Sequence, residues 1–230
     1  MPHIRRVTWA RTFRIIRSIH PPIDLFEDIA DPKDWEALAS VEAKTNPRVR
    51  GEIGDLGKVP VHRRVAGPGA SYVMAPFVHC SPLWPGRFSN GNYGVYYAGN
   101  SEEVALAETI HHHSKFMAST HEDAGWTSQF RLLIGAIDAD LTDVNDLPDV
   151  LHVSDYSHSQ KVGAEIRDAG GNGLVWNSVR CPAGECIGAF WPDVVSIPVQ
   201  TSHFSYHWNG VRVDFIKRLD TGDVLEVTDA

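Results

Sequence analysis

Cysteine is scarce in this 230-residue chain, and its small number argues against a disulfide-stabilised secreted domain. The three cysteines, Cys80, Cys181 and Cys186, are an odd number, and the basic N-terminus MPHIRRVTWARTFRIIRSIH lacks the apolar stretch of a secretory signal. We therefore expect a reducing, cytoplasmic location. Cys181 and Cys186 are too few for a structural zinc site, so we interpret all three as small buried side chains rather than ligands or nucleophiles.

An excess of positive charge is also missing. The chain has 21 Lys and Arg against 29 Asp and Glu, a formal net charge of −8, and a pI near 5.8. Its cationic residues are scattered rather than arranged in a stripe, so we expect no direct nucleic-acid binding. An anionic ligand must then be held by a few local cations or backbone N–H groups, which favours a small, enclosed ligand.

Several widespread motifs are absent. No apolar run approaches the roughly 20 residues of a membrane span, so we expect no membrane insertion. The sequence contains no G-x-G-x-x-G after a first strand, no G-x-x-x-x-G-K-[ST] and no G-x-S-x-G. Dinucleotide binding of the Rossmann type, P-loop chemistry and the nucleophile elbow of α/β-hydrolases are therefore not supported.

A metal site is not expected, although the chain has 12 histidines. His111, His112 and His113 are consecutive, and neighbouring helical residues point about 100° apart, so they cannot converge on one ion. The acidic stretch from Asp138 to Asp146 lacks the glycine and closing glutamate of a calcium loop. We interpret the histidines as a solvated helix end and the acidic stretch as a solvated turn.

The residues that are present predict one α+β domain over 1–230, with a mainly antiparallel β core flanked by helices. Apolar patterns and turn signals place its elements. Residues 9–19 are expected to form a strand or a short amphipathic element, and further strands are expected at 94–99, 130–138, 173–179, 186–191 and 194–199. Expected helices cover 31–40 and 159–170, and a C-terminal hairpin covers 203–219. Pro21 is expected to end the first strand. Residues 44–70, within an elaborated segment of about 30–80, are interpreted as a surface excursion.

The clearest helix signal begins near residue 100. Asn100 is expected to cap this helix, with Glu103 completing a capping box. Glu108 falls on the edge of the apolar arc of the helix, so its backbone is fixed by packing while its carboxylate faces a cavity. The arc consists of Val104, Leu106, Ala107 and Ile110.

Four polar or aromatic residues remain as candidates for function: Arg87, Tyr97, Glu108 and Ser178. Taken singly, each also has a structural interpretation. Arg87 could occupy a surface turn, Tyr97 the core, Glu108 an exposed helix face and Ser178 a turn. Their combination is more informative than any one of them.

The order and spacing of these residues resemble the RES-domain family. In GRFSNGNYGVYYAGNSEEVALAE, Tyr97 follows Arg87 by ten residues and Glu108 follows Tyr97 by eleven. The later block GAEIRDAGGNGLVWNSVRCPAGEC is similar to the family's G-L-x-x-x-S-x-R-x-P-x-G-E, with Ser178 as its serine. Phe13-Arg14 resembles the N-terminal Tyr-Arg of the family, with Phe in place of Tyr. The likeness spans about residues 11–200, which we take as the domain core.

This resemblance implies a fold similar to that of ADP-ribosyltransferase toxins and the role of toxin in a RES–Xre toxin–antitoxin pair. Glu108, Arg87 and Tyr97 would be catalytic, and Arg87, Tyr97, Ser178 and Arg14 would bind NAD. NAD would be the substrate, with phosphate or water as acceptor and no further cofactor or metal. The partner would be an Xre-type helix-turn-helix antitoxin, and a homodimer is left open.

The residue chemistry agrees with NAD cleavage. A guanidinium can hold the pyrophosphate, a tyrosine face can stack on nicotinamide, and a carboxylate can stabilise an oxocarbenium-like ribosyl cation. Ser178 would give a neutral hydrogen bond to the ribose or carboxamide. Two alternatives stay open: a mono-ADP-ribosyltransferase that modifies a protein, and a noncatalytic module that binds NAD or the antitoxin. Adjacent strand residues face opposite ways, so only one of Tyr96 and Tyr97 can line the site, and the family spacing selects Tyr97.

Overall fold

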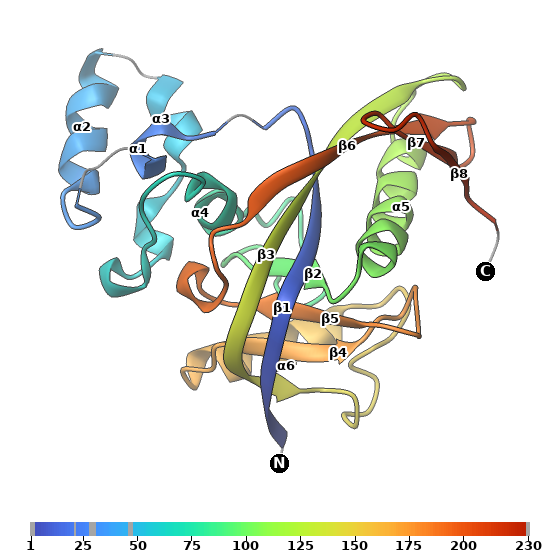
Figure 1. The fold of residues 1–230 in the computed structure, drawn as a ribbon. Helices are drawn as coiled ribbons and strands as arrows, with labels where there is room; N and C mark the ends of the chain where they lie inside the picture. Colours follow the sequence, from blue (N-terminus) through green and yellow to red (C-terminus); the bar gives the residue numbers. More distant parts are fainter. Residues whose placement is uncertain (1–2, 21, 28–30, 46–47, 229–230) are drawn as a thin grey trace.

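The computed structural model describes residues 3–20, 22–27, 31–45 and 48–228, and the predicted α+β class is confirmed (Figure 1). The strands are β1 (His3–Arg17), β2 (Tyr96–Gly99), β3 (Thr127–Asp143), β4 (Gly173–Asn177), β5 (Glu185–Ala189), β6 (Val199–Trp208), β7 (Val213–Arg218) and β8 (Val224–Glu226). The α-helices are α1 (Asp24–Glu27), α2 (Trp35–Thr45), α3 (Arg48–Ile53), α4 (Ser71–Val78), α5 (Glu102–Ala118) and α6 (Ser157–Asp168). Three short 3₁₀ helices cover Leu56–Lys58, Val61–Arg63 and Pro192–Val194.

The sheet is mainly antiparallel, as expected. Its order is β1-β2-β5-β4-β3-β6-β7-β8, and β1 also pairs with β3, so the first five of these strands close on themselves. Among the described strands, β3 and β4 are the parallel neighbours. The long strands β1 and β3 run crosswise to β4 and β5, with α1 to α4 on one side and α5 on the other (Figure 1).

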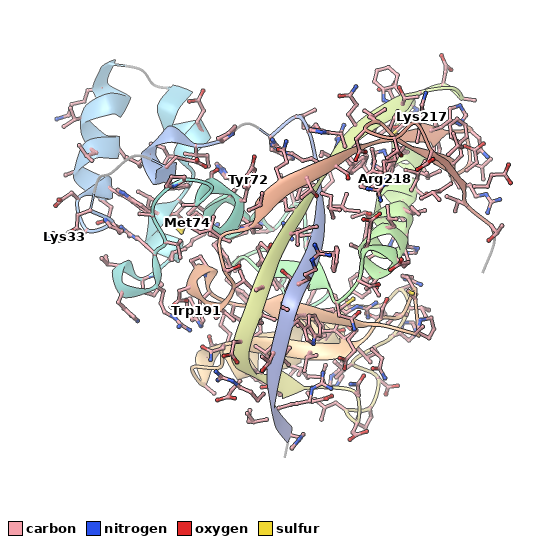
Figure 2. The ribbon with its side chains drawn as sticks, viewed as in Figure 1. Lys33, Tyr72, Met74, Trp191, Lys217 and Arg218 are labelled. Atoms are coloured by element: carbon pink, nitrogen blue, oxygen red, sulfur yellow. The ribbon has the colours of Figure 1, made fainter. Side chains whose placement is uncertain are left out.

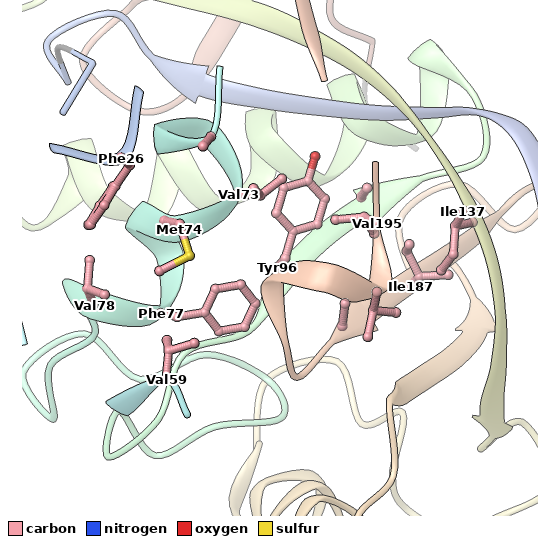
Figure 3. Packing of buried hydrophobic residues seen from close by; sticks show 14 of the residues in the cluster. Phe26, Val59, Val73, Met74, Phe77, Val78, Tyr96, Ile137, Ile187 and Val195 are labelled. Carbon is pink, nitrogen blue, oxygen red and sulfur yellow. The ribbon is translucent and has the colours of Figure 1, made fainter. Parts of the chain in front are cut away.

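The main core lies between the sheet and the N-terminal helices. Tyr96 of β2 is fully buried there and lies between Val73 of α4 and Val195 (Figure 3). Ile187 and Ala189 of β5 face the same core. Two further clusters occupy the other faces of the sheet, one beneath α6 and one beneath α5.

The interpretation of residues 44–70 as a surface excursion is wrong. Ile53, Leu56 and Val59 are buried in the main core, and Arg64 is buried as well. The Arg64 guanidinium donates to the backbone oxygens of Pro32, Leu56 and Val59, so it holds this segment together from inside. Residues 30, 46 and 47 of the wider segment lie outside the described residues.

Other element predictions need smaller corrections. The strand predicted at 9–19 begins already at His3, and the strand predicted at 130–138 spans Thr127–Asp143. The strand predicted at 194–199 does not form as one element: Val194 ends a 3₁₀ turn, Val195 makes a single bridge to Ile137, and Val199 is the first residue of β6. Pro21, expected to end the first strand, lies outside the described residues.

Helix α4, which the sequence did not predict, is fixed to the sheet by a polar contact. Tyr72 of α4 lies beside β6 (Figure 2), and its hydroxyl donates to Oε1 of Gln200 in β6 at 3.1 Å. The buried Arg131 of β3 donates to the same oxygen at 3.1 Å. None of the helices in the described ranges has the length and apolar character needed to cross a bilayer.

Candidate functional site

Helix α5 carries the central residue of the candidate site. Its N-cap is Ser101, whose hydroxyl accepts from the Val104 N–H at 3.3 Å, so the predicted Asn100 cap is wrong. Asn100 instead exchanges hydrogen bonds with the backbone of Glu185, accepting at 3.0 Å through its side chain. This contact ties the start of α5 to β5 and sets the direction of the helix.

Glu108 is fixed on α5 by a hydrogen bond from Ser178. The Ser178 hydroxyl donates to Glu108 Oε1 at 2.8 Å and accepts from the N–H groups of Arg180 and Cys181 at 3.2 and 3.0 Å. A serine hydroxyl has one proton and two lone pairs, so the buried Ser178 is fully used. The Glu108 side chain keeps 23% of its surface exposed, which leaves its second oxygen available.

Two further side chains contact this carboxylate. The thiol of the buried Cys186 lies 3.7 Å from Glu108 Oε1. Burial, followed by the charge of Glu108, raises the pKa of the Cys186 thiol, so it stays protonated and is no nucleophile. His112, one helical turn on, places its Nε2 atom 3.9 Å from Glu108 Oε2.

Arg87 is not a surface turn residue. Its side chain is buried, its Nη1 atom donates to the His152 carbonyl oxygen at 2.7 Å, and its guanidinium lies 4.4 Å from the centre of the Tyr156 ring. Its positive charge lowers the pKa values of Tyr97, His112 and Cys186, although burial dominates the shift at each of them. Arg87 is therefore within electrostatic range of Tyr97 and of His112 and Cys186, the two side chains beside Glu108.

Tyr96 and Tyr97 face opposite sides of β2. Tyr96 points into the main core, whereas Tyr97 packs edge-on against Trp176 with ring centres 6.3 Å apart. The Tyr97 hydroxyl accepts from the Phe88 N–H at 3.0 Å, so this residue also holds the turn that carries Arg87. Burial raises the pKa of both phenols, that of Tyr96 to about 12.

Arg14 is separated from the other predicted residues by β2. Its Nη1 atom donates to the Tyr97 carbonyl oxygen at 2.8 Å, and its guanidinium lies 4.6 Å from the centre of the Tyr96 ring. It therefore lies on the Tyr96 side of the strand. Desolvation lowers the pKa of its guanidinium, and the geometry gives it a contact with the strand rather than with Glu108.

Arg180 is a residue of this site that the sequence analysis did not select. Its Nη2 atom donates to the Val153 oxygen at 2.5 Å, and within the described residues its buried Nε atom has no hydrogen-bond partner. Desolvation and the charge of Arg180 lower the pKa of His111 to about 4 and also lower that of His112. The signal was present, because Arg180 is the arginine of the S-x-R-x-P block.

The comparisons with known proteins identify the family. A profile described as "RES domain" matches residues 60–209. The chain belongs to the RES-domain family. This chain is also similar to the Sinorhizobium fredii protein named "Uncharacterized protein y4oC". The two are 27% identical over 209 residues, and the match covers 90% of this chain and 87% of the relative.

One solved structure resembles this RES-domain chain more distantly. It is titled "Crystal structure of the M.tuberculosis MbcT-MbcA toxin-antitoxin complex". The similarity has a TM-score of 0.44 at 10% identity and covers 86% of each chain. Within the described part of the RES-domain chain, no three His, Cys, Asp or Glu side chains gather in a way that could hold a metal ion.

Proposed function

We propose that this RES-domain protein cleaves the bond between nicotinamide and ribose in NAD. The observation that supports this most directly is the half-buried Glu108 carboxylate, held through one oxygen by Ser178 and leaving the other available. A fixed, partly exposed carboxylate can stabilise a positive charge that develops on the ribosyl carbon. The matching RES profile supplies the family context for the same assignment.

In the proposed reaction, the C–N bond breaks and nicotinamide leaves with its electron pair as a neutral molecule. The ribosyl carbon becomes cationic, opposite the charge of Glu108. Water then attacks this carbon and releases a proton to solvent, or an anionic phosphate oxygen attacks it. The products are nicotinamide with either ADP-ribose or its 1''-phosphate.

Charge complementarity supports a dinucleotide as the substrate. The chain has a net charge of −8, but Arg87 and Arg180 place two guanidinium groups within electrostatic range of His112, next to Glu108. Guanidinium groups bind pyrophosphate through paired, charge-assisted hydrogen bonds. We assign Ser178 a positioning role, because its proton is donated to Glu108 rather than to a ligand.

We further propose that the protein is the toxin of a toxin–antitoxin pair, neutralised by an Xre-type helix-turn-helix protein. This role rests on the family resemblance, and depletion of NAD would explain toxicity. Co-expression with the product of the adjacent reading frame tests it. Growth arrest by the chain alone and normal growth on co-expression are expected, whereas arrest in both cases would contradict the pairing.

Glu108→Gln tests the reaction itself. The change is nearly isosteric but removes the charge, so we expect nicotinamide release to fall about 10² to 10³-fold while NAD binding persists. The measurement is release of nicotinamide from labelled NAD, with Glu103→Gln, an exposed glutamate of the same helix, as the control. Turnover within a few-fold of wild type in Glu108→Gln would overturn the assignment.

The same assay identifies the acceptor. Free ADP-ribose indicates hydrolysis, and the 1''-phosphate indicates phosphorolysis. Label retained on a protein band would instead support the mono-ADP-ribosyltransferase alternative.

A further inference from the structure

A large aromatic side chain is exposed close to the candidate site. Trp84 is 71% exposed, and among the described residues it is paired with the ring of Phe116 on α5, with ring centres 6.2 Å apart. Exposure of a large apolar ring to water is unfavourable, and tryptophans are enriched at binding interfaces, where their rings can stack on a partner. Trp84 precedes Arg87 by three residues, so both belong to the same segment.

The turn that presents Trp84 is rigid. Pro82 and Pro85 flank it, and Ser81 accepts the Leu83 N–H through its hydroxyl at 3.3 Å and the Trp84 N–H through its carbonyl at 2.9 Å. Gly91 packs closely against the backbone of this turn, because an added Cβ at Gly91 would lie 2.1 Å from the Ser81 carbonyl oxygen. A ring held in this way loses little conformational entropy on binding a ligand.

The aromatic pair is aligned with Glu108 along one side of α5. Glu108, His112 and Phe116 are four residues apart, so they form a stripe on the helix. Eight residues separate its ends, which corresponds to about 12 Å along the axis. His112 lies in the middle of this stripe, and after burial the charges of Arg180 and Arg87 lower its pKa. A ligand with an anionic group between a reacting ribose and a planar ring would match this order, with the ribose at Glu108, the anion near His112 and the ring at Phe116.

We propose that Trp84 and Phe116 form the subsite for the adenine ring of the substrate, with the pyrophosphate between them and Glu108. This inference rests on the proposed function and adds the binding mode of the adenylate half. In an extended dinucleotide, the pyrophosphate and second ribose separate the adenine from the reacting ribose by a comparable length. Arg17, whose guanidinium lies 5.2 Å from the centre of the Phe116 ring, adds a positive charge beside this aromatic pair.

Calorimetric binding of the two halves of NAD tests this subsite without requiring catalysis. Stacking of a base on an aromatic ring predicts that Trp84→Ala weakens AMP binding about 10-fold or more. Binding of nicotinamide mononucleotide should stay within about 2-fold, since that half contacts the Glu108 end. Trp84→Phe should retain most of the AMP affinity.

Two variants control for nonspecific effects. Leu83→Ala removes an apolar side chain that is 81% exposed on the same turn, and Trp126→Ala removes another exposed tryptophan, 49% exposed, immediately before β3. Both should bind AMP as the wild type does. No measurable AMP binding by the wild type, unchanged AMP affinity in Trp84→Ala, or equal weakening of both halves would overturn the subsite.

The two proposals fail in different ways. If nicotinamide release is absent but AMP affinity depends on Trp84, the proposed reaction is wrong and the adenylate subsite stands. If NAD is cleaved but AMP affinity is insensitive to Trp84, the subsite is wrong and the exposed turn serves another contact, such as a protein partner.

Discussion

At the scale of single residues, the two neighbouring tyrosines of β2 differ in how their hydroxyl groups are paired. The Tyr96 hydroxyl is buried and makes no hydrogen bond within the described residues. The Tyr97 hydroxyl accepts the Phe88 N–H, and an added Cβ at Gly86 would lie 2.9 Å from it. One hydroxyl is therefore a cost to the fold and the other supports the turn before Arg87.

This difference predicts opposite effects for the same substitution. Tyr97→Phe leaves the Phe88 N–H unpaired and should lower the free energy of unfolding by about 1–3 kcal/mol. Tyr96→Phe removes an unpaired buried hydroxyl and should leave stability unchanged or raise it by up to about 1 kcal/mol. Urea unfolding of both variants measures the effects, and equal losses would show that the two environments are not as described.

The residue scale also shows what the sequence could not assign. The family spacing selected Tyr97, and the structure places Tyr97 with Arg87 and Tyr96 in the core. Arg14 was grouped with the NAD-binding residues, yet its guanidinium lies on the Tyr96 side of β2. Strand alternation fixes which residues share a face, but the side of the sheet that becomes the site depends on packing.

At the scale of elements, the start of α5 distinguishes two adjacent residues with similar cap propensity. Asn and Ser are both favoured N-caps, so local sequence alone does not choose between Asn100 and Ser101. Strand β5 decides between them, because its Glu185 N–H donates to the Asn100 side chain, and the Ser101 hydroxyl accepts from the Val104 N–H of the helix.

Amide exchange can separate these two roles. Ser101→Ala should destabilise the helix end by about 1 kcal/mol and speed exchange of the Val104 amide. Asn100→Ala should instead speed exchange of the Glu185 amide and leave Val104 protected. Faster exchange at Val104 in Asn100→Ala alone would restore Asn100 as the cap.

At the scale of the whole molecule, one buried cation holds the N-terminal helices together. Arg64 has a side chain that is 2% exposed, and it pairs with Glu36 of α2 in addition to its three backbone acceptors. These contacts connect α2 to the segment that contains the 3₁₀ helices Leu56–Lys58 and Val61–Arg63. They supply hydrogen bonds to backbone oxygens that no regular helix or strand satisfies there.

Arg64→Ala should therefore destabilise this segment as a unit. Removing the guanidinium leaves several buried oxygens unpaired, so we expect a loss of about 3 kcal/mol or more and faster limited proteolysis within residues 31–63. Lys33→Ala, which breaks an exposed ion pair with Asp31, should change stability by less than about 1 kcal/mol. Similar proteolysis of the two variants would contradict the role of Arg64.

The sequence by itself determined the α+β class, the position of α5 and the order of Arg87, Tyr97, Glu108 and Ser178, because helix periodicity, strand alternation and motif spacing are local properties. It did not determine that residues 44–70 contribute to the core, since Ile53, Leu56 and Val59 lie three residues apart but among glycines and prolines, which argue against a continuous helix.

Only the tertiary structure decided how the site is assembled. The hydrogen bond from Ser178 to Glu108 joins residues 70 positions apart, and the approach of Arg180 and Trp84 to α5 depends on the same packing. Contacts of this kind follow from strand pairing and from the direction of each side chain on its element. Neither is encoded in the spacing of any one segment.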